Sequence, residues 1–173
     1  MMAALEAEIA DLIRESRAMT GRIQTIGTVE SATGGRVADR ITNTPGSSGY
    51  FKGSVVAYHN EVKIGLLQVK KSTIEDQGAV SEQTALEMAQ GGRKLLDVDI
   101  CISDTGIAGP AGGAPDKPVG LFYLALAAED TASVQRHVFT GNREENKRDA
   151  AEAALDMLRQ YLLMRLEKSG GAA

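Results

Sequence analysis

The sequence predicts an α/β fold, a three-layer α/β/α sandwich with a mixed sheet of about five strands. Helical and strand patterns alternate through the first part of the chain, which is typical of parallel strands joined by helices. Two strand patterns then follow one another near the C-terminus, which indicates an antiparallel pair. We find neither an internal repeat nor an inter-domain linker. We therefore expect one domain over residues 1–168 and a flexible tail at 169–173.

The first third of the chain contains two predicted helices and two predicted strands. Leucine and isoleucine recur at helical spacing over residues 3–19. Residues 22–29 are rich in β-branched side chains and read as a strand, which leads through a hydroxyl-rich turn into a helix at 34–42. Turn-forming residues occupy 43–49, and the second strand follows at 51–58.

The middle of the chain contains a short and a long predicted helix. Asn60 is suited to cap the short one, and Ser81 is suited to cap the long one at residues 82–96. The long helix contains Gly91 and Gly92, each of which costs about 1 kcal/mol in helix propensity. We expect close packing of this helix on the sheet as the compensation.

The last third of the chain contributes three strands, at residues 99–103, 119–127 and 132–139, and a long loop at 106–118 dense in glycine and proline. A final helix is predicted over residues 143–168, because apolar side chains recur there at helical spacing. Asn142 and Glu145 are spaced as a capping box at its start. The expected buried stripe of this helix consists of Ala151, Leu155, Leu158, Leu162 and Leu166.

Composition excludes several classes of function. The net charge is -4 and the isoelectric point is about 5.3, which argues against binding of nucleic acid or an anionic membrane. No apolar stretch approaches the roughly 20 residues that a membrane span needs. The single cysteine, Cys101, fits a reducing compartment, and we expect a cytoplasmic protein without a metal or organic cofactor.

The turn from Ser31 to Gly35 is the strongest candidate for a functional site. It joins a predicted strand to a predicted helix, so the Ser31 hydroxyl is expected near free backbone N–H groups and the positive end of the helix dipole. Such a site suits either binding of an anion or attack on a carbonyl. Two more loops share this character, one at Ser47 and Ser48 and one running from Thr105 to Gly113.

Lys63 is a candidate general base for such a serine, provided that burial keeps the amine neutral. Spacing alone does not separate this interpretation from a solvated surface lysine. Neither His59 nor His137 has neighbours at metal-ligand spacing, so a zinc site is not expected, although His59 can line the site. Cys101 is expected to pack in the core. Arg143 can clamp a phosphate or lie on the helix surface.

Seven short motifs in this chain together resemble the CinA C-terminal domain family, which includes bacterial nicotinamide-mononucleotide deamidases. The resemblance runs from about Glu6 to Leu166, and it is closest to the stand-alone form, since larger members carry a further domain ahead of this one. The motifs are Glu30-Ser31-x-Thr33-Gly34-Gly35, Pro45-Gly46-Ser47-Ser48, Tyr58-x-Asn60-Glu61-x-Lys63, Gly78-Ala79-Val80-Ser81, Thr105-Gly106-Ile107-Ala108-Gly109-Pro110, Lys117-Pro118-Val119-Gly120 and Gly141-x-Arg143-Glu144.

The resemblance implies a serine–lysine amidase that converts nicotinamide mononucleotide to nicotinate mononucleotide and ammonia in pyridine nucleotide salvage. Ser31 is the first choice as nucleophile and Ser48 the second, with Lys63 as base and Tyr58 as a relay or orienting group. Backbone N–H groups near Thr33 and Gly34 are expected to hold the oxyanion. Ribose and phosphate would lie on the loop after the third strand and on the last helix. The full substrate-binding set is Thr33, Gly34, Gly35, Thr105, Gly106, Gly109, Gly112 and Arg143.

Three positions depart from the family pattern: Ala32 replaces a common cysteine, His59 a small polar residue, and Asp104 a small or uncharged residue. Asp104 can repel a phosphate, pair with Lys63 or Arg143, or alter specificity, and pairing with Lys63 would raise the pKa of the amine. Alternative functions are a non-catalytic nucleotide-binding module and an amidase for another carboxamide. A homodimer is possible, because the apolar faces of the first and last helices can cover either the sheet or a second copy.

Overall fold

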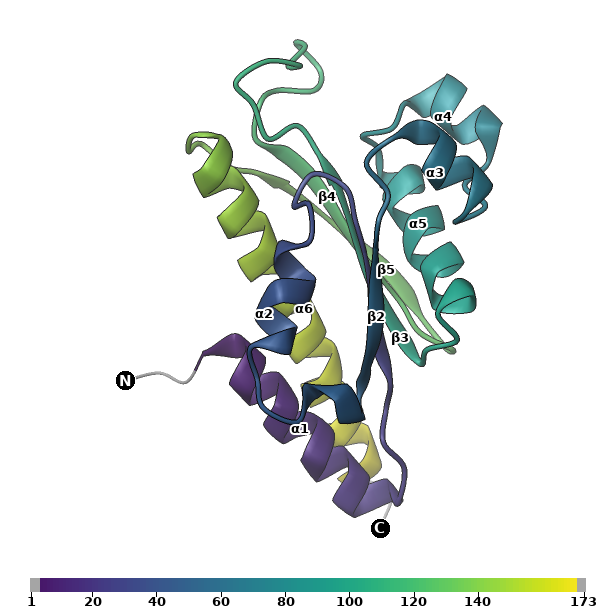
Figure 1. Ribbon diagram of the computed structural model, residues 1–173, viewed down its shortest axis with the longest axis vertical. Helices are drawn as coiled ribbons and strands as arrows, with labels where there is room; N and C mark the ends of the chain where they lie inside the picture. The colour runs from purple at the N-terminus through teal and green to yellow at the C-terminus, as the bar shows by residue number, and fades with distance from the viewer. Residues whose placement is uncertain (1–3, 171–173) are drawn as a thin grey trace.

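The computed structural model describes residues 4–170 and shows a mixed five-stranded sheet between two helical layers, which confirms the predicted architecture (Figure 1). The strand order is β2-β1-β3-β4-β5. β1 runs parallel to both β2 and β3, whereas β3, β4 and β5 are successively antiparallel. The carboxyl ends of β1, β2 and β3 therefore meet at one edge of the sheet. The strands are β1 (Ile26–Glu30), β2 (Phe51–Val56), β3 (Ile100–Gly106), β4 (Leu121–Ala127) and β5 (Ala132–Val138).

Helices lie on both faces of the sheet (Figure 1). The first layer consists of α1 (Leu5–Thr20), α2 (Arg36–Thr42) and α6 (Arg143–Gly170). The second layer consists of α3 (Asn60–Gly65), α4 (Lys71–Gln77) and α5 (Glu82–Leu95). A single 3₁₀ turn, η1 (Ser47–Gly49), precedes β2.

Side chains alternate along the strands between two hydrophobic cores, as the pleat of a strand requires. On β3, Ile100 and Ile102 face the α1–α2–α6 layer, whereas Cys101 faces α5. The predicted apolar faces of α1 and α6 are buried in the first of these cores, which also contains Ile9, Leu12, Ile13, Leu155, Leu158 and Leu162. These faces cover the sheet of the same chain, so they are not available for a dimer interface.

The helix α5 packs closely on the sheet, as the two glycines in its sequence predicted. A β-carbon at Gly92 would lie 2.1 Å from Val29 Cγ2 and 2.9 Å from Cys101 Sγ. One at Gly91 would lie 1.8 Å from the Leu67 carbonyl oxygen. Both positions therefore require a residue without a side chain.

The structure differs from the predicted elements in several places, and β1 begins at Ile26 rather than at residue 22. The helix α4 was not predicted at all. The strand β3 continues to Gly106, so Thr105 and Gly106 lie within a strand rather than in a loop. The cap of α3 is His59, whose Nδ1 accepts the Glu61 N–H, and not Asn60. The helix α6 extends through 169–170, the first two residues of the predicted tail. Residues 171–173 of that tail lie outside the described residues, as do residues 1–3 of the predicted domain, which include the predicted start of the first helix at residue 3.

Within residues 4–170, no helix combines the length and the apolar character that a bilayer span demands.

Candidate active site

The cavity at the carboxyl ends of β1, β2 and β3 brings together six of the predicted site residues. Its volume is about 180 Å³. Predicted site residues in its wall are Ser31, Tyr58, Lys63, Thr105, Gly106 and Arg143. This position agrees with the rule that ligands of α/β sheets bind beyond the carboxyl ends of the strands.

Ser31 and Lys63 form the chemical centre of this cavity. Lys63 Nζ lies 3.1 Å from Ser31 Oγ and 2.7 Å from the Ala57 carbonyl oxygen. The Lys63 side chain is 2 % exposed, and no ion pair within residues 4–170 includes it. A lysine amine within hydrogen-bond reach of a serine hydroxyl is the arrangement expected of a nucleophile and its base.

The local fold explains why Lys63 reaches Ser31. The strands β1 and β2 are parallel neighbours, so the residues that follow them lie side by side. Helix α3 begins three residues after β2, and Lys63 on it turns back over the end of both strands. Burial lowers the pKa of Lys63 below its ordinary value, while the charge of Asp104 acts in the opposite direction.

Two buried carboxylates lie beneath the Ser31 turn. Val29 on β1 pairs with Ser103 on β3. Glu30 and Asp104 come directly after these two residues, so they lie side by side at the same edge and on the same face of the sheet. Asp104 accepts hydrogen bonds from the backbone N–H groups of Ser31, Ala32 and Thr33, at 3.1, 2.8 and 3.1 Å. Asp104 therefore neither forms an ion pair with Lys63 nor contacts Arg143: it holds the serine turn.

Glu30 performs a similar task at the start of α2. Its carboxylate accepts the backbone N–H groups of Gly35, Val37 and Ala38, at 2.8, 3.1 and 2.8 Å. The predicted free N–H groups at this strand–helix junction are thus occupied by two side-chain carboxylates. The Thr33 N–H is one of them, so it is not available to an oxyanion, whereas none of the hydrogen bonds found within residues 4–170 involves the Gly34 N–H, the other expected donor.

The Thr33 hydroxyl joins the two carboxylates. It contacts Glu30 Oε2 at 2.7 Å and also contacts Asp104 Oδ1. Because a hydroxyl carries one proton, it can donate to only one of them. The second carboxyl group forms a hydrogen bond with the Thr33 oxygen when that carboxyl group is itself protonated and donates. Burial raises the pKa of Asp104 to about 6, and the nearby charge of Glu30 adds to this effect.

Arg143 and Tyr58 form the outer wall of the cavity. Arg143 Nη1 donates to the Gly109 carbonyl oxygen at 2.7 Å, and Nη2 donates to Tyr58 Oη at 3.1 Å. Tyr58 is 64 % exposed. Its hydroxyl is therefore bound to Arg143, rather than to Lys63 as a proton relay would need.

Ser48, the second candidate nucleophile, lies at the wrong end of the sheet. It belongs to η1, which precedes β2, and Tyr50 next to it accepts the Ile26 N–H at the start of β1. Ser31 follows the end of β1, one strand length away. Ser48 is exposed and takes no part in the Ser31 cavity. The prediction that it serves catalysis is wrong.

Five further predicted binding residues do not line the cavity. Thr33 is buried against the carboxylates, and Gly35 donates its N–H to Glu30, so both stabilise the turn. Gly109 presents its carbonyl oxygen to Arg143, and Gly112 is exposed in the outer loop. Gly34 lies next to Lys147.

A backbone segment that lies in one of the seven motifs, but that was not among the predicted site residues, also lines the cavity. Ala79 and Val80 line it, and the Thr105 hydroxyl holds them by donating to the Ala79 carbonyl oxygen at 2.7 Å. Asn146 on α6 is buried and donates to the Ala108 carbonyl oxygen at 3.0 Å, which anchors the loop after β3. A polar residue of low helix propensity inside a helix was the available signal for Asn146.

The remaining candidates have structural roles. Cys101 is fully buried, and burial raises the pKa of its thiol to about 12, which leaves it unreactive. His59 caps α3 and does not line the cavity, and the His137 ring stacks on Phe139. Over residues 4–170, no group of three or more His, Cys, Asp or Glu side chains is arranged to hold a metal ion.

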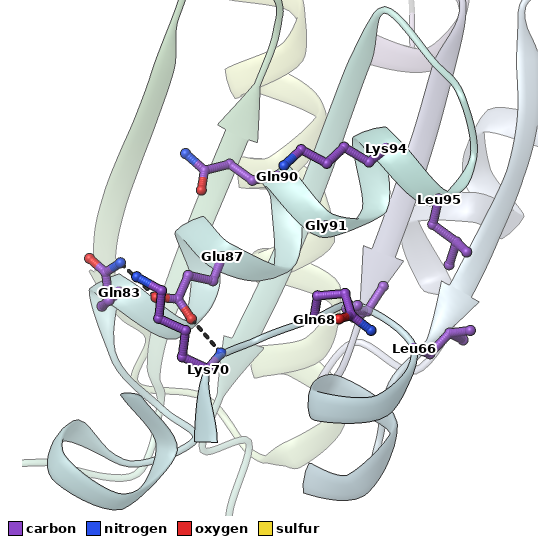
Figure 2. A pocket seen from close by; sticks show the side chains of 10 residues that line it. Leu66, Gln68, Lys70, Gln83, Glu87, Gln90, Gly91, Lys94 and Leu95 are labelled. Carbon is purple, nitrogen blue, oxygen red and sulfur yellow. Dashed lines mark hydrogen bonds between the residues drawn. The ribbon is translucent and has the colours of Figure 1, made fainter. Parts of the chain in front are cut away.

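A larger cavity of about 540 Å³ lies between α5 and the segment from Leu66 to Lys70, but it lacks a reactive centre (Figure 2). Glu87 is its only carboxylate. The Lys70 N–H, the Thr73 hydroxyl and the Gln83 amide all donate to it, at 2.8, 2.9 and 2.9 Å. Glu87 therefore joins α4 to α5.

Comparison with known proteins identifies the family of the chain. The family model of the CinA C-terminal domain matches residues 5–162. The chain is 41% identical over 159 residues to a CinA-like protein of Sulfurihydrogenibium sp., a match that covers 92% of this chain and 38% of that protein. It is 50% identical over 146 residues to a CinA-like protein of Syntrophomonas wolfei, covering 84% and 34%. The chain thus spans between a third and two fifths of the length of these relatives.

Solved structures share the fold over nearly their whole length. The competence/damage inducible protein CihA from Agrobacterium tumefaciens superposes with a TM-score of 0.79 at 34% identity, covering 91% of this chain and 96% of that one. A CinA superfamily protein from Klebsiella pneumoniae superposes with a TM-score of 0.82 at 30% identity, covering 94% and 99%.

Proposed function

The chain belongs to the CinA C-terminal domain family, and from this premise we propose that it hydrolyses the carboxamide of nicotinamide mononucleotide to nicotinate mononucleotide and ammonia. The observation that carries the proposal is the 3.1 Å contact between Lys63 Nζ and Ser31 Oγ in a cavity where Lys63 has no carboxylate partner. The reaction belongs to pyridine nucleotide salvage.

In the first half of the reaction, Ser31 Oγ attacks the carboxamide carbon while its proton passes to Lys63 Nζ. Lys63 then returns this proton to the leaving nitrogen, and the C–N bond breaks to release ammonia. In the second half, water attacks the ester on Ser31 and gives a proton to Lys63, which passes it to Ser31 Oγ as the ester bond breaks.

Two influences favour a neutral Lys63 before attack, against the opposing charge of Asp104. Burial lowers the pKa of its ammonium. The Ala57 carbonyl accepts one N–H of Lys63, which orients the nitrogen beside the Ser31 hydroxyl without favouring the neutral form. The positively charged pyridinium ring of the substrate further disfavours protonation of Lys63.

The test is release of ammonia from nicotinamide mononucleotide by the purified protein. We expect Ser31→Ala to abolish release and Ser48→Ala, a matched serine replacement at the opposite end of the sheet, to leave it unchanged. The removal of a serine nucleophile costs on the order of 10⁶-fold in kcat. Equal rates for the wild type and Ser31→Ala would overturn the proposal. Activity restricted to other members of a carboxamide panel would point instead to a different amidase.

A non-catalytic nucleotide-binding module is the second candidate function. The observation that favours it is the occupation of the Ser31, Ala32 and Thr33 N–H groups by Asp104, because an amidase often uses such groups to hold its oxyanion. This candidate predicts calorimetric binding of the mononucleotide without release of ammonia.

A further inference from the structure

We propose that Lys147 binds the phosphate of the substrate, beside Arg143 and above Gly34; this inference rests on the proposed function. Lys147 Nζ would lie only 3.4 Å from a β-carbon at Gly34, so the ammonium sits directly over that glycine. Neighbouring charges on α6 have partners: Arg143 binds Gly109 and Tyr58, and Glu144 binds Arg36. Of the hydrogen bonds and ion pairs found within residues 4–170, none involves Lys147 Nζ.

The volume of the Ser31 cavity places the phosphate outside it. Ligand pockets usually measure about 300–1,000 Å³, whereas this cavity measures about 180 Å³. It therefore suits the carboxamide-bearing ring, and the ribose and phosphate must extend past its mouth. Arg143 lies at that mouth.

The loop after β3, which we expected to hold the phosphate, presents acceptors towards α6. The Gly109 carbonyl faces Arg143, and the Ala108 carbonyl faces Asn146. Carbonyl oxygens repel a phosphate, so this side of the mouth does not suit an anion. Of the two expected positions for ribose and phosphate, this loop and the last helix, the helix is therefore the one that suits the phosphate.

The geometry of α6 and of the turn fits one nucleotide. Arg143 and Lys147 are four residues apart on a helix, so their side chains share one face. Gly34 follows Ser31 by three residues, which limits the separation of their Cα atoms to about 10 Å. A carboxamide at Ser31 and a phosphate at Lys147 are thus within the reach of a molecule whose two ends are separated by one ribose.

Gly34 keeps this site open. Its φ is +68°, a left-handed conformation that glycine adopts without strain, and any side chain would enter the space beside the ammonium. The glycine thus leaves room above the turn for a ligand oxygen.

The experiment compares nicotinamide mononucleotide with nicotinamide riboside, which lacks the phosphate. We expect Lys147→Gln to raise KM for the mononucleotide about 10- to 100-fold, the value of one charge-assisted hydrogen bond, with little change in kcat. KM for the riboside should stay unchanged. Lys147→Arg should restore most of the affinity. Arg148→Gln is the matched control, because Arg148 is the next cation on α6 and pairs with Asp149.

Calorimetry on a Ser31→Ala background separates this inference from the proposed reaction. Suppose that the wild type releases no ammonia, but that the protein binds the mononucleotide more tightly than the riboside and Lys147→Gln weakens this binding. The proposed reaction would then be wrong, and the phosphate site would stand. An equal effect of Lys147→Gln on both ligands, no effect on the mononucleotide, or no binding of either ligand would overturn the inference.

Discussion

At the residue scale, Asp104 links the conformation of the nucleophile to the protonation of its base. It is 1 % exposed, holds three consecutive N–H groups of the Ser31 turn, and its charge opposes deprotonation of Lys63. The side chain of an unperturbed aspartate ionises well below neutral pH. The pKa of Asp104 is about 6, so its charge changes in mildly acidic solution.

We predict that Asp104→Asn moves the ascending limb of the pH–activity profile to lower pH. Activity rises as Lys63 loses its proton, and removal of the Asp104 charge lowers the pKa of Lys63 further. The measurement is kcat/KM for ammonia release from about pH 5 to 10. Thr33→Val is the control: it removes a hydroxyl contact that lowers the pKa of Asp104, so this pKa rises but the residue still ionises, and the limb should move less than in Asp104→Asn. An unchanged limb in Asp104→Asn would contradict the coupling.

The same carboxyl also makes stability depend on pH. A folded-state pKa raised from 3.8 to about 6 means that the folded state binds this proton more tightly. The contribution of Asp104 to stability is therefore full below about pH 3.8 and is lost as pH rises through about 6, an effect on the order of 3 kcal/mol. The measurement is the free energy of unfolding in urea, for the wild type and for Asp104→Asn, at pH 4 and at pH 7. The difference between the two proteins should change between the two pH values by the contribution of Asp104.

At the element scale, the contact of α5 with the sheet depends on a missing side chain. We predict that Gly92→Ala destabilises the protein by about 1–3 kcal/mol, because overpacking against Val29 and Cys101 outweighs the gain of about 1 kcal/mol in helix propensity. The measurement is the midpoint and slope of urea unfolding. Gly65→Ala is the matched control, because a β-carbon at this helical glycine meets nothing within 4 Å. Gly65→Ala should be neutral or stabilising, and a Gly92→Ala variant as stable as the wild type would contradict the close contact.

The elements that the sequence failed to predict depend on contacts between distant segments. Helix α4 has little apolar periodicity. Its first turn is held by Glu87 on α5, whose carboxylate accepts hydrogen bonds from the Lys70 N–H and the Thr73 hydroxyl. By contrast, Asn142 and Glu145 form the capping box that their spacing predicted, since that signal is local.

At the scale of the whole molecule, strand direction predicted the edge of the sheet at which the site lies. Ser31 and Lys63 both follow parallel strands, but only the family resemblance paired them, because spacing did not separate Lys63 from a solvated surface lysine. Ser48 was mistaken because turn composition does not reveal at which end of a strand a turn lies. The role of Asp104 depends on the β1–β3 register, which no local pattern contains.

A ligand that binds only the folded chain must also stabilise it. We predict that nicotinamide mononucleotide at about 100 times its Kd stabilises the Ser31→Ala variant by about 2.7 kcal/mol, which raises Tm by about 5–11 °C. The measurement is thermal unfolding with and without the nucleotide, and nicotinamide riboside at the same concentration should give a smaller shift. No shift with either compound would contradict binding in the Ser31 cavity.

The anchoring of the Ser31 turn to Glu30 and Asp104 has a consequence for the energetics of catalysis. A nucleophile on a loose loop loses conformational entropy each time a substrate binds. Here the backbone on both sides of Ser31 is already fixed by hydrogen bonds to two strands of the sheet. That ordering cost is met once, when the chain folds, and every later encounter with substrate meets a serine that is already oriented for attack.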